Sequence, residues 1–158
     1  MIIVDTREQK WDHIRQYFEN HGIEYEVKKL DEGDYFNTEC PGIVIDRKAH
    51  LQEICTNLSK GSHNIVRFTN ECKRARQNNL RFIVLIEGTN YRTVKEVAAW
   101  QSKYSKHTGK WLVDRMFAMT LSYNVEWMLC RKNETAKRIL EVLNYGKEQE
   151  QIHSSKSE

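Results

Sequence analysis

The stretch from residue 42 to residue 48 reads Gly42-Ile43-Val44-Ile45-Asp46-Arg47-Lys48. Its first four residues form an apolar run rich in β-branched side chains, which predicts a short buried strand. Side chains alternate along a strand, so Asp46 and Lys48 leave one face of it and Arg47 leaves the other. We therefore expect a carboxylate and an ammonium to project together from the end of a buried strand.

A second carboxylate lies upstream, in Gly33-Asp34-Tyr35. The turn signal Cys40-Pro41-Gly42 lies between the two segments, so the chain can double back and bring Asp34 beside Asp46. Two acidic oxygen ligands suit Mg²⁺ or Mn²⁺, which prefer hard oxygens. Lys48 can then hold the attacking water or offset the charge that develops on a phosphate. This combination predicts metal-assisted hydrolysis of a phosphodiester.

These residues resemble a known nuclease motif. Gly33-Asp34 followed by residues 44–48 is similar to the motif of the XPF-type (ERCC-type) nuclease domain, a branch of the PD-(D/E)XK superfamily. The family pattern is Gly-Asp, a variable stretch, Glu-Arg-Lys, three further residues and Asp. Residues 2–8 resemble the family strand that ends in Asp-x-Arg-Glu, and residues 80–88 resemble the strand that follows the motif. The resemblance covers the chain from its first residue to about residue 145.

Two positions depart from the family pattern. Asp46 stands where the family has Glu, which keeps the carboxylate and shortens its reach. The final Asp of the pattern falls at Gln52, with Glu53 next to it. We expect Gln52 to alter the affinity for metal, while the core of Asp34, Asp46 and Lys48 is intact.

The resemblance implies a Mg²⁺- or Mn²⁺-dependent DNA endonuclease. It is expected to act on branched, flap or nicked DNA in repair, recombination or phage DNA processing, and to need no small-molecule cofactor. Carried over to this sequence, the motif gives Asp34, Asp46 and Asp5 as metal ligands and Lys48 as the group that orients the attacking water. Glu8 is a further candidate catalytic residue. The alternative is a non-catalytic DNA-binding module that retains the nuclease fold, and a nuclease for RNA or for free ends also stays open.

Several basic residues are candidate contacts for DNA. Arg47 has two possible roles, either contact with a phosphate or an ion pair with Glu8 beneath the site. The loop around Tyr104 mixes cations with an aromatic ring, which suits unstacked bases, and a solvated loop is the alternative interpretation. The remaining candidates are Lys60, His63, Arg67, Lys103 and Lys106.

The apolar periodicity alternates between helix and strand along the chain. Such alternation predicts an α/β fold with a mixed central β-sheet flanked by helices, which agrees with the restriction-endonuclease-like fold that the resemblance implies. Thr93 and Glu96 have the spacing of a capping box, and Asn133 is a candidate cap for the last helix. We expect strands at 43–45, 82–86 and 125–130, and helices at 11–18, 51–58, 65–75, 93–100, 112–123 and 136–143.

Length, charge and cysteine content limit the classes of protein to which the chain can belong. The chain has 158 residues, a formal net charge of +3 and a pI near 8.6, which permits binding to nucleic acid without requiring it. The length suits one domain, which we expect at residues 1–146, with a polar tail at 147–158. No apolar run approaches membrane-spanning length, and the scattered cysteines show no zinc spacing. We expect a cytoplasmic protein of a bacterial or phage-infected cell, associated with DNA and not with a membrane.

Two expectations concern assembly. No Gly-x-Gly hairpins of the helix-hairpin-helix type follow residue 130, and no helicase segment precedes residue 1. The chain therefore resembles the small stand-alone members of the family that bacteria and their phages carry. Family members often dimerise through the nuclease domain, so a homodimer is expected, with the helices at 111–123 and 133–145 as the candidate surface.

Overall fold

A mixed six-stranded sheet forms the centre of the computed structural model, which describes residues 1–146. The strands lie in the order β2-β1-β3-β4-β5-β6. They are β1 (Ile2–Val4), β2 (Tyr25–Val27), β3 (Tyr35–Asn37), β4 (Ile43–Lys48), β5 (Arg81–Ile86) and β6 (Glu126–Leu129). The α-helices are α1 (Asp12–Asn20), α2 (Leu51–Leu58), α3 (His63–Gln77), α4 (Gly109–Tyr123) and α5 (Thr135–Val142), and two short 3-10 helices are η1 (Val94–Ala99) and η2 (Lys132–Glu134).

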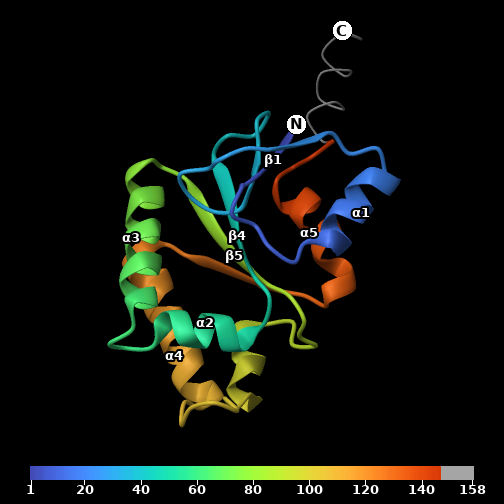
Figure 1. Ribbon diagram of the computed structural model, residues 1–158. Helices are drawn as coiled ribbons and strands as arrows, with labels where there is room; N and C mark the ends of the chain where they lie inside the picture. The colour runs from blue at the N-terminus through green and yellow to red at the C-terminus, as the bar shows by residue number, and fades with distance from the viewer. Residues whose placement is uncertain (147–158) are drawn as a thin grey trace, which may run out of the picture.

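Helices cover both faces of this sheet, as the sequence predicts. Helices α1 and α5 lie on one face, and α2, α3 and α4 lie on the other (Figure 1). The alternation along β4 separates the two sides: Val44 packs towards α2 and α3, while Ile43 and Ile45 pack towards α1 and α5. Asp46 and Lys48 continue the first row and Arg47 continues the second, which confirms the predicted faces.

The chain doubles back between the two parts of the motif, as the turn signal predicts. Strands β3 and β4 are antiparallel, with Tyr35 opposite Ile45. Strand β1 is antiparallel to β3 on its other side, with Val4 opposite Tyr35. Strands β4, β5 and β6 run parallel to one another. The ends of β1 and β4 and the start of β3 therefore meet at one edge of the sheet.

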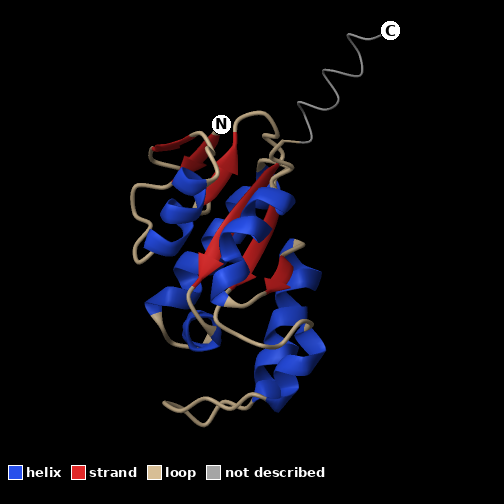
Figure 2. Cartoon of the chain, turned by 90° about the vertical axis from the view of Figure 1, so that its right-hand side faces the viewer, coloured by secondary structure: helices blue, strands red, loops and turns tan. Residues whose placement is uncertain are grey.

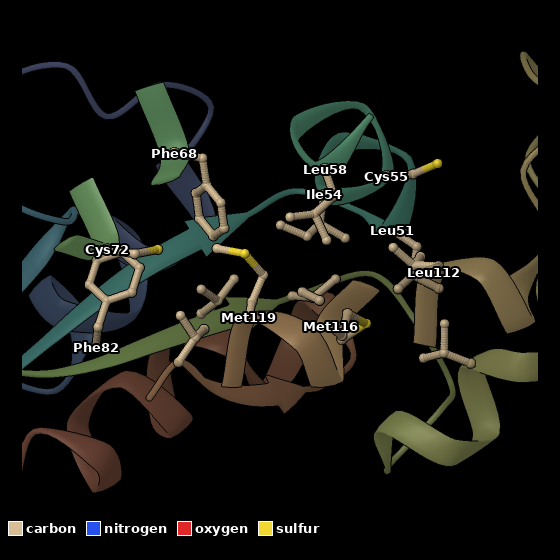
Figure 3. Close-up of a cluster of buried hydrophobic side chains, with 14 of the residues drawn as sticks. Leu51, Ile54, Cys55, Leu58, Phe68, Cys72, Phe82, Leu112, Met116 and Met119 are labelled. Carbon is tan, nitrogen blue, oxygen red and sulfur yellow. The ribbon is translucent and has the colours of Figure 1, made fainter. Parts of the chain in front are cut away.

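The larger hydrophobic core lies between the sheet and helices α2 to α4. Figure 3 shows Phe68 and Cys72 from α3, Phe82 from β5, and Met116 and Met119 from α4 converging in this layer. Full burial of a side chain of this size stabilises the fold by about 1.5–3 kcal/mol. This layer fixes α2 and α3 on the sheet, and these two helices border the acidic edge described below.

Two local predictions need correction. The segment after Thr93 forms the 3-10 helix η1 and not an α-helix. Thr93 caps it as predicted, because its hydroxyl accepts from the Glu96 amide at 3.4 Å, but the Glu96 carboxylate accepts from the Arg92 amide (3.1 Å) and does not complete the capping box. The last helix starts at Thr135, so Asn133 lies inside η2 and does not cap it. The expected polar tail at 147–158 lies outside the described residues.

The segment between η1 and α4 forms a loop at residues 101–108. Figure 2 shows it projecting from the helical end of the molecule, away from the sheet. An isolated bridge between Gln101 and Thr108 closes its base. None of the helices in the described part of the chain is long and apolar enough to cross a membrane.

Candidate active site

Three aspartates stand in a row at one edge of the sheet. Asp5 follows β1, Asp34 precedes β3 and Asp46 lies in β4. The Asp34 backbone joins the three strands, because its carbonyl accepts from the Asp5 amide (2.8 Å) and its amide donates to the Ile45 carbonyl (2.7 Å). Residues opposite one another on neighbouring strands place their Cβ atoms about 5 Å apart. The strand pairing therefore brings the three acids together, as the motif predicts.

Asp34 and Asp46 form a carboxylate pair in which Asp46 is buried and Asp34 is half-buried. One Asp34 oxygen accepts a hydrogen bond from the Arg47 backbone amide at 2.8 Å. Burial raises the pKa of Asp34 well above its usual range, and the charges of Asp46 and Glu8 raise it further. Its hydrogen bond with Asp46 also favours the protonated form. The pair holds more negative charge than its surroundings compensate.

The Oδ2 atom of Asp46 lacks a hydrogen-bond partner among the described residues, although it is buried. The Lys48 ammonium lies 3.1 Å from it as an ion pair, in a geometry that does not make a hydrogen bond. A buried carboxylate oxygen that accepts no hydrogen bond costs free energy, and the single charge of one ammonium does not balance two neighbouring carboxylates. The site therefore suits a divalent cation.

Lys48 is held in its charged form. Burial lowers the pKa of its ammonium, but the carboxylates of Asp46 and Glu53 outweigh burial and raise it above the ordinary value. The ammonium also lies over the Phe68 ring, 5.2 Å from its centre. A lysine that stays protonated at neutral pH can donate hydrogen bonds to a water or a phosphate, but it cannot take up a proton as a general base.

Asp5 is part of the row, but its oxygens are engaged elsewhere. Its Oδ2 accepts from the Arg7 side chain at 2.8 Å, and its Oδ1 accepts from the Leu30 amide at 2.8 Å. Burial raises the pKa of Asp5, but these hydrogen bonds outweigh burial and lower it. No group of three or more His, Cys, Asp or Glu side chains within residues 1–146 is arranged to hold a metal ion. A cation between Asp34 and Asp46 would take its other ligands from water, backbone or phosphate oxygens, as Mg²⁺ commonly does.

Arg47 lies on the opposite face of β4, buried between two carboxylates. Its guanidinium donates to both oxygens of Glu8 at 2.9 and 3.0 Å, and it also donates to Glu87. Of the two roles that the sequence left open, this geometry corresponds to the ion pair with Glu8. Glu87 also accepts from the Thr135 hydroxyl at 2.7 Å and lies 2.7 Å from the His13 ring nitrogen.

Two acidic residues near the site escaped the sequence analysis. Glu87 directly follows β5, which is the parallel neighbour of β4, the strand that ends in Arg47 and Lys48. A charged residue directly after an apolar strand was the signal that the sequence offered. Glu71 on α3 accepts a hydrogen bond from the Gly33 amide at 2.7 Å. Burial raises the pKa of Glu71, as does the charge of Asp46. In the sequence, the position of Glu71 next to the buried residues of α3 was only a weak signal that it contacts the site.

Two adjoining cavities meet at the carboxylate pair. One, of about 370 Å³, extends towards α3, and the other, of about 390 Å³, extends towards α2; Asp34, Asp46 and Arg7 line both. Arg67 and Arg74 line the first cavity. Of the predicted DNA contacts, Arg67 lines the first cavity, and Arg47, which is largely buried, lines the second. The others lie outside these two cavities: Lys60 and His63 are exposed around the start of α3, and Lys103, Tyr104 and Lys106 are exposed on the loop 101–108.

Comparison with known proteins gives a family and a fold. The ERCC4 domain model matches residues 4–142. The structure of XPF from Aeropyrum pernix is 20% identical in sequence and superposes with a TM-score of 0.67, covering 90% of this chain and 62% of the other. XPF from Aeropyrum pernix in complex with DNA is 19% identical with a TM-score of 0.68, covering 94% of this chain and 65% of the other. This chain thus spans less than two thirds of either solved chain. No curated protein sequence matches it.

Proposed function

Because this chain belongs to the ERCC4 domain family, a family of DNA nucleases, we propose that it is a Mg²⁺- or Mn²⁺-dependent endonuclease that cuts branched, flap or nicked DNA. The nuclease domain would be residues 1–146, working in the cytoplasm in DNA repair, recombination or phage DNA processing. One observation carries the proposal, namely the Asp34–Asp46 carboxylate pair, in which a buried Asp46 oxygen accepts no hydrogen bond and lies 3.1 Å from the charged Lys48 ammonium.

The residues of the candidate site divide into metal ligands and supporting groups in this proposal. Asp34 and Asp46 would hold the ion, which when bound polarises the phosphate and activates a water. Lys48 would orient that water and stabilise the charge that develops on the phosphate, because its ammonium stays protonated beside Asp46. Asp5 would become a ligand only when Arg7 releases its Oδ2, and Glu8 would act indirectly by holding Arg47.

The DNA backbone would follow the basic side chains around the cleft. Arg67 and Arg74 line the cavity that opens from the carboxylate pair towards α3. Lys60 and His63 are exposed further along this side. Side chains of this kind position the phosphates and carry no sequence information, which suits recognition of DNA shape. The solved relative in complex with DNA supports DNA as the partner.

Cleavage of labelled DNA tests the proposal. Duplex, flap, splayed-arm and four-way junction substrates are incubated with Mg²⁺, Mn²⁺ or EDTA, with wild type, Asp46→Asn and Lys48→Met. Cutting that needs metal is expected, and each substitution should lower kcat by about 10²-fold or more. The matched control is Lys106→Met, an exposed lysine outside the cleft, which should retain metal dependence.

The outcomes separate the two candidate functions. DNA binding without cutting, unaffected by Asp46→Asn and independent of Mg²⁺, would favour a non-catalytic DNA-binding module. Absence of both binding and cutting would overturn both. Thermal unfolding gives a readout independent of activity, because Mg²⁺ should raise the Tm of wild type and not that of Asp46→Asn.

We further propose that two copies associate through α4. Of the two helices expected at the dimer surface, α4 carries exposed apolar side chains, Phe117 at 43% and Leu121 at 85% exposure, one turn apart. The outer face of α5 instead carries ion pairs of Arg138 with Glu134 and Glu141. A second copy is the occupant that covers such a patch without any other component.

A further inference from the structure

A third cavity, of about 340 Å³, lies next to the candidate active site, between the start of α2 and the loop 101–108. Three aromatic residues line it, Tyr91, Trp100 and Tyr104, together with the cation Lys103. None of the described residues that line it is acidic, in contrast to the two cavities at the carboxylate pair. Its volume is at the lower end of the range of sites that take small ring compounds.

The loop that carries Tyr104 is anchored from below. Ser102 is buried, and its hydroxyl donates to the Gln52 side-chain oxygen on α2 at 2.8 Å. The same hydroxyl accepts from the backbone amides of Tyr104 and Ser105 at 3.2 and 3.1 Å. The loop backbone is therefore fixed before any ligand arrives, which reduces the entropy lost on binding.

Tyr104 itself is left exposed on this fixed loop. Its side chain is 84% exposed, and its hydroxyl has no hydrogen-bond partner in the described part of the chain. The other aromatic residue of the loop, His107, stacks on Trp111 of α4 with 3.6 Å between ring centres, so Tyr104 is the loop's free ring. An aromatic ring held in water on an ordered loop is suited to stacking against another flat ring.

The cavity adjoins the candidate active site. His50 lines both this cavity and the one that contains Asp46 and Lys48. It is only two residues beyond Lys48, so the two positions are within about 8 Å along the backbone. A DNA strand with its phosphate at Lys48 therefore has a neighbouring nucleotide within reach of the cavity.

We propose that this cavity binds an unpaired base of the DNA, stacked against Tyr104 and walled by Tyr91 and Trp100, with Lys103 beside its phosphate. A base in a duplex is already stacked and paired, so only a strand that is single-stranded or opened near the cut can fill the site. The inference rests on the proposed function and extends it, because it makes an unpaired nucleotide beside the scissile phosphate part of the preferred substrate. It also assigns a role to Gln52, which supports the loop by accepting a hydrogen bond from the Ser102 hydroxyl.

Binding to two oligonucleotides of equal length tests this proposal. One is an oligothymidylate and the other carries abasic sites in place of the bases, so both have the same phosphates. Affinities are measured by fluorescence anisotropy in EDTA, where no cutting occurs. Tyr104→Ala should weaken binding of the oligothymidylate about 5- to 100-fold and leave binding of the abasic strand unchanged. Tyr104→Phe, which keeps the ring, should bind both like wild type.

The loop also supplies a matched control. Lys106→Ala removes a charge from the same loop and should weaken both oligonucleotides by the same factor, because phosphates attract it equally in each. The proposal is overturned if Tyr104→Ala weakens both strands equally or weakens neither. If wild type bound neither strand and cut no DNA, the proposed function would fail as well, so the two failures are distinguishable.

Discussion

At the scale of single residues, the main electrostatic feature is the environment of Asp34, which disfavours its ionised form. Its pKa is raised by burial and by neighbouring Asp46 and Glu8, so the folded chain binds this proton more tightly than the unfolded chain does. Stability from such a group is complete below the unfolded pKa of about 4 and is lost as the pH rises through the folded pKa. Without metal, Asp34 therefore contributes less stability at neutral pH than it does below about pH 4.

Asp34→Asn should accordingly stabilise the metal-free protein while abolishing its activity. An Asn oxygen can still accept from the Arg47 amide, but the buried charge is removed. Each pKa unit of the shift corresponds to about 1.4 kcal/mol, so we expect a Tm increase of at least about 2 °C in EDTA at neutral pH. Scanning calorimetry measures it, and the difference should disappear below about pH 4. Asp31→Asn, an exposed acid nearby, should leave the Tm unchanged.

Arg47 provides a prediction about stability alone. Arg47→Met leaves Glu8 and Glu87 buried without their cation, so it should lower the free energy of unfolding by about 3–5 kcal/mol. Arg81→Met is the matched control, because Arg81 makes a two-bond contact with Glu126 at the surface, and its loss should cost about 1 kcal/mol or less. Equal losses measured by urea denaturation would contradict the buried role.

The sequence could predict contacts among the residues of the motif strands. Asp34, Asp46 and Lys48 follow from alternation and a turn signal, and the pairing of Arg47 with Glu8 was one of two stated alternatives. Glu87, His13 and Glu71 could not be placed in this way, because their contacts depend on how helices α1 and α3 and strand β5 pack onto the sheet. Periodicity gives the buried face of a helix and not which strand end it faces.

At the scale of elements, the turn before β3 is the most constrained part of the site. Gly33 has φ +72°, and a Cβ there would lie 2.4 Å from a Val44 methyl group and 2.8 Å from the Ile45 carbonyl oxygen. Both contacts are too close for real atoms, and one of them is with backbone. The turn that presents Asp34 therefore requires glycine, both for its conformation and for its closeness to β4.

Gly33→Ala should destabilise the protein and displace Asp34 together. The control is Gly22→Ala after α1, where φ is +63° and nothing lies within 4 Å of the added Cβ. The conformation alone costs about 1–2 kcal/mol at either position, and the clash at Gly33 adds to it. Chemical denaturation should show the larger loss for Gly33→Ala, and only this variant should lose the rise in Tm caused by Mg²⁺.

Most element types were predictable from periodicity, while the side-chain contacts at two helix starts were not. Leu51, Ile54 and Leu58 identify α2, and the apolar run after Arg81 identifies β5. The incomplete capping box at Thr93 and the wrong cap at Asn133 have one cause, because competing side-chain contacts decide how a helix begins. The Glu96 carboxylate is taken by the Arg92 amide, and Glu134 is held by the Arg131 amide at 3.2 Å.

At the scale of the whole molecule, the apolar patch of α4 predicts the state of association. Wild type should elute as a dimer, and Leu121→Glu should convert it to a monomer by placing a charge in the apolar contact. Light scattering during gel filtration gives the mass. Val66→Glu is the control, because Val66 is 59% exposed on α3 and lies outside the proposed contact. A monomeric wild type would contradict the prediction.

Asp34 and Asp46 lie close together in the sequence, which affects the order in which the contacts of the site form during synthesis. The amide of Arg47 and the carboxylate of Asp34 are 13 positions apart, whereas Arg47 and Glu87 are 40 apart and Glu87 and Thr135 are 48 apart. Short loops close first, and synthesis proceeds from the N-terminus. A growing chain therefore holds both acids of the candidate site and the Glu8 partner of Arg47 before it has Glu87, and the contact between Glu87 and Thr135 can form only after helix α5 has left the ribosome.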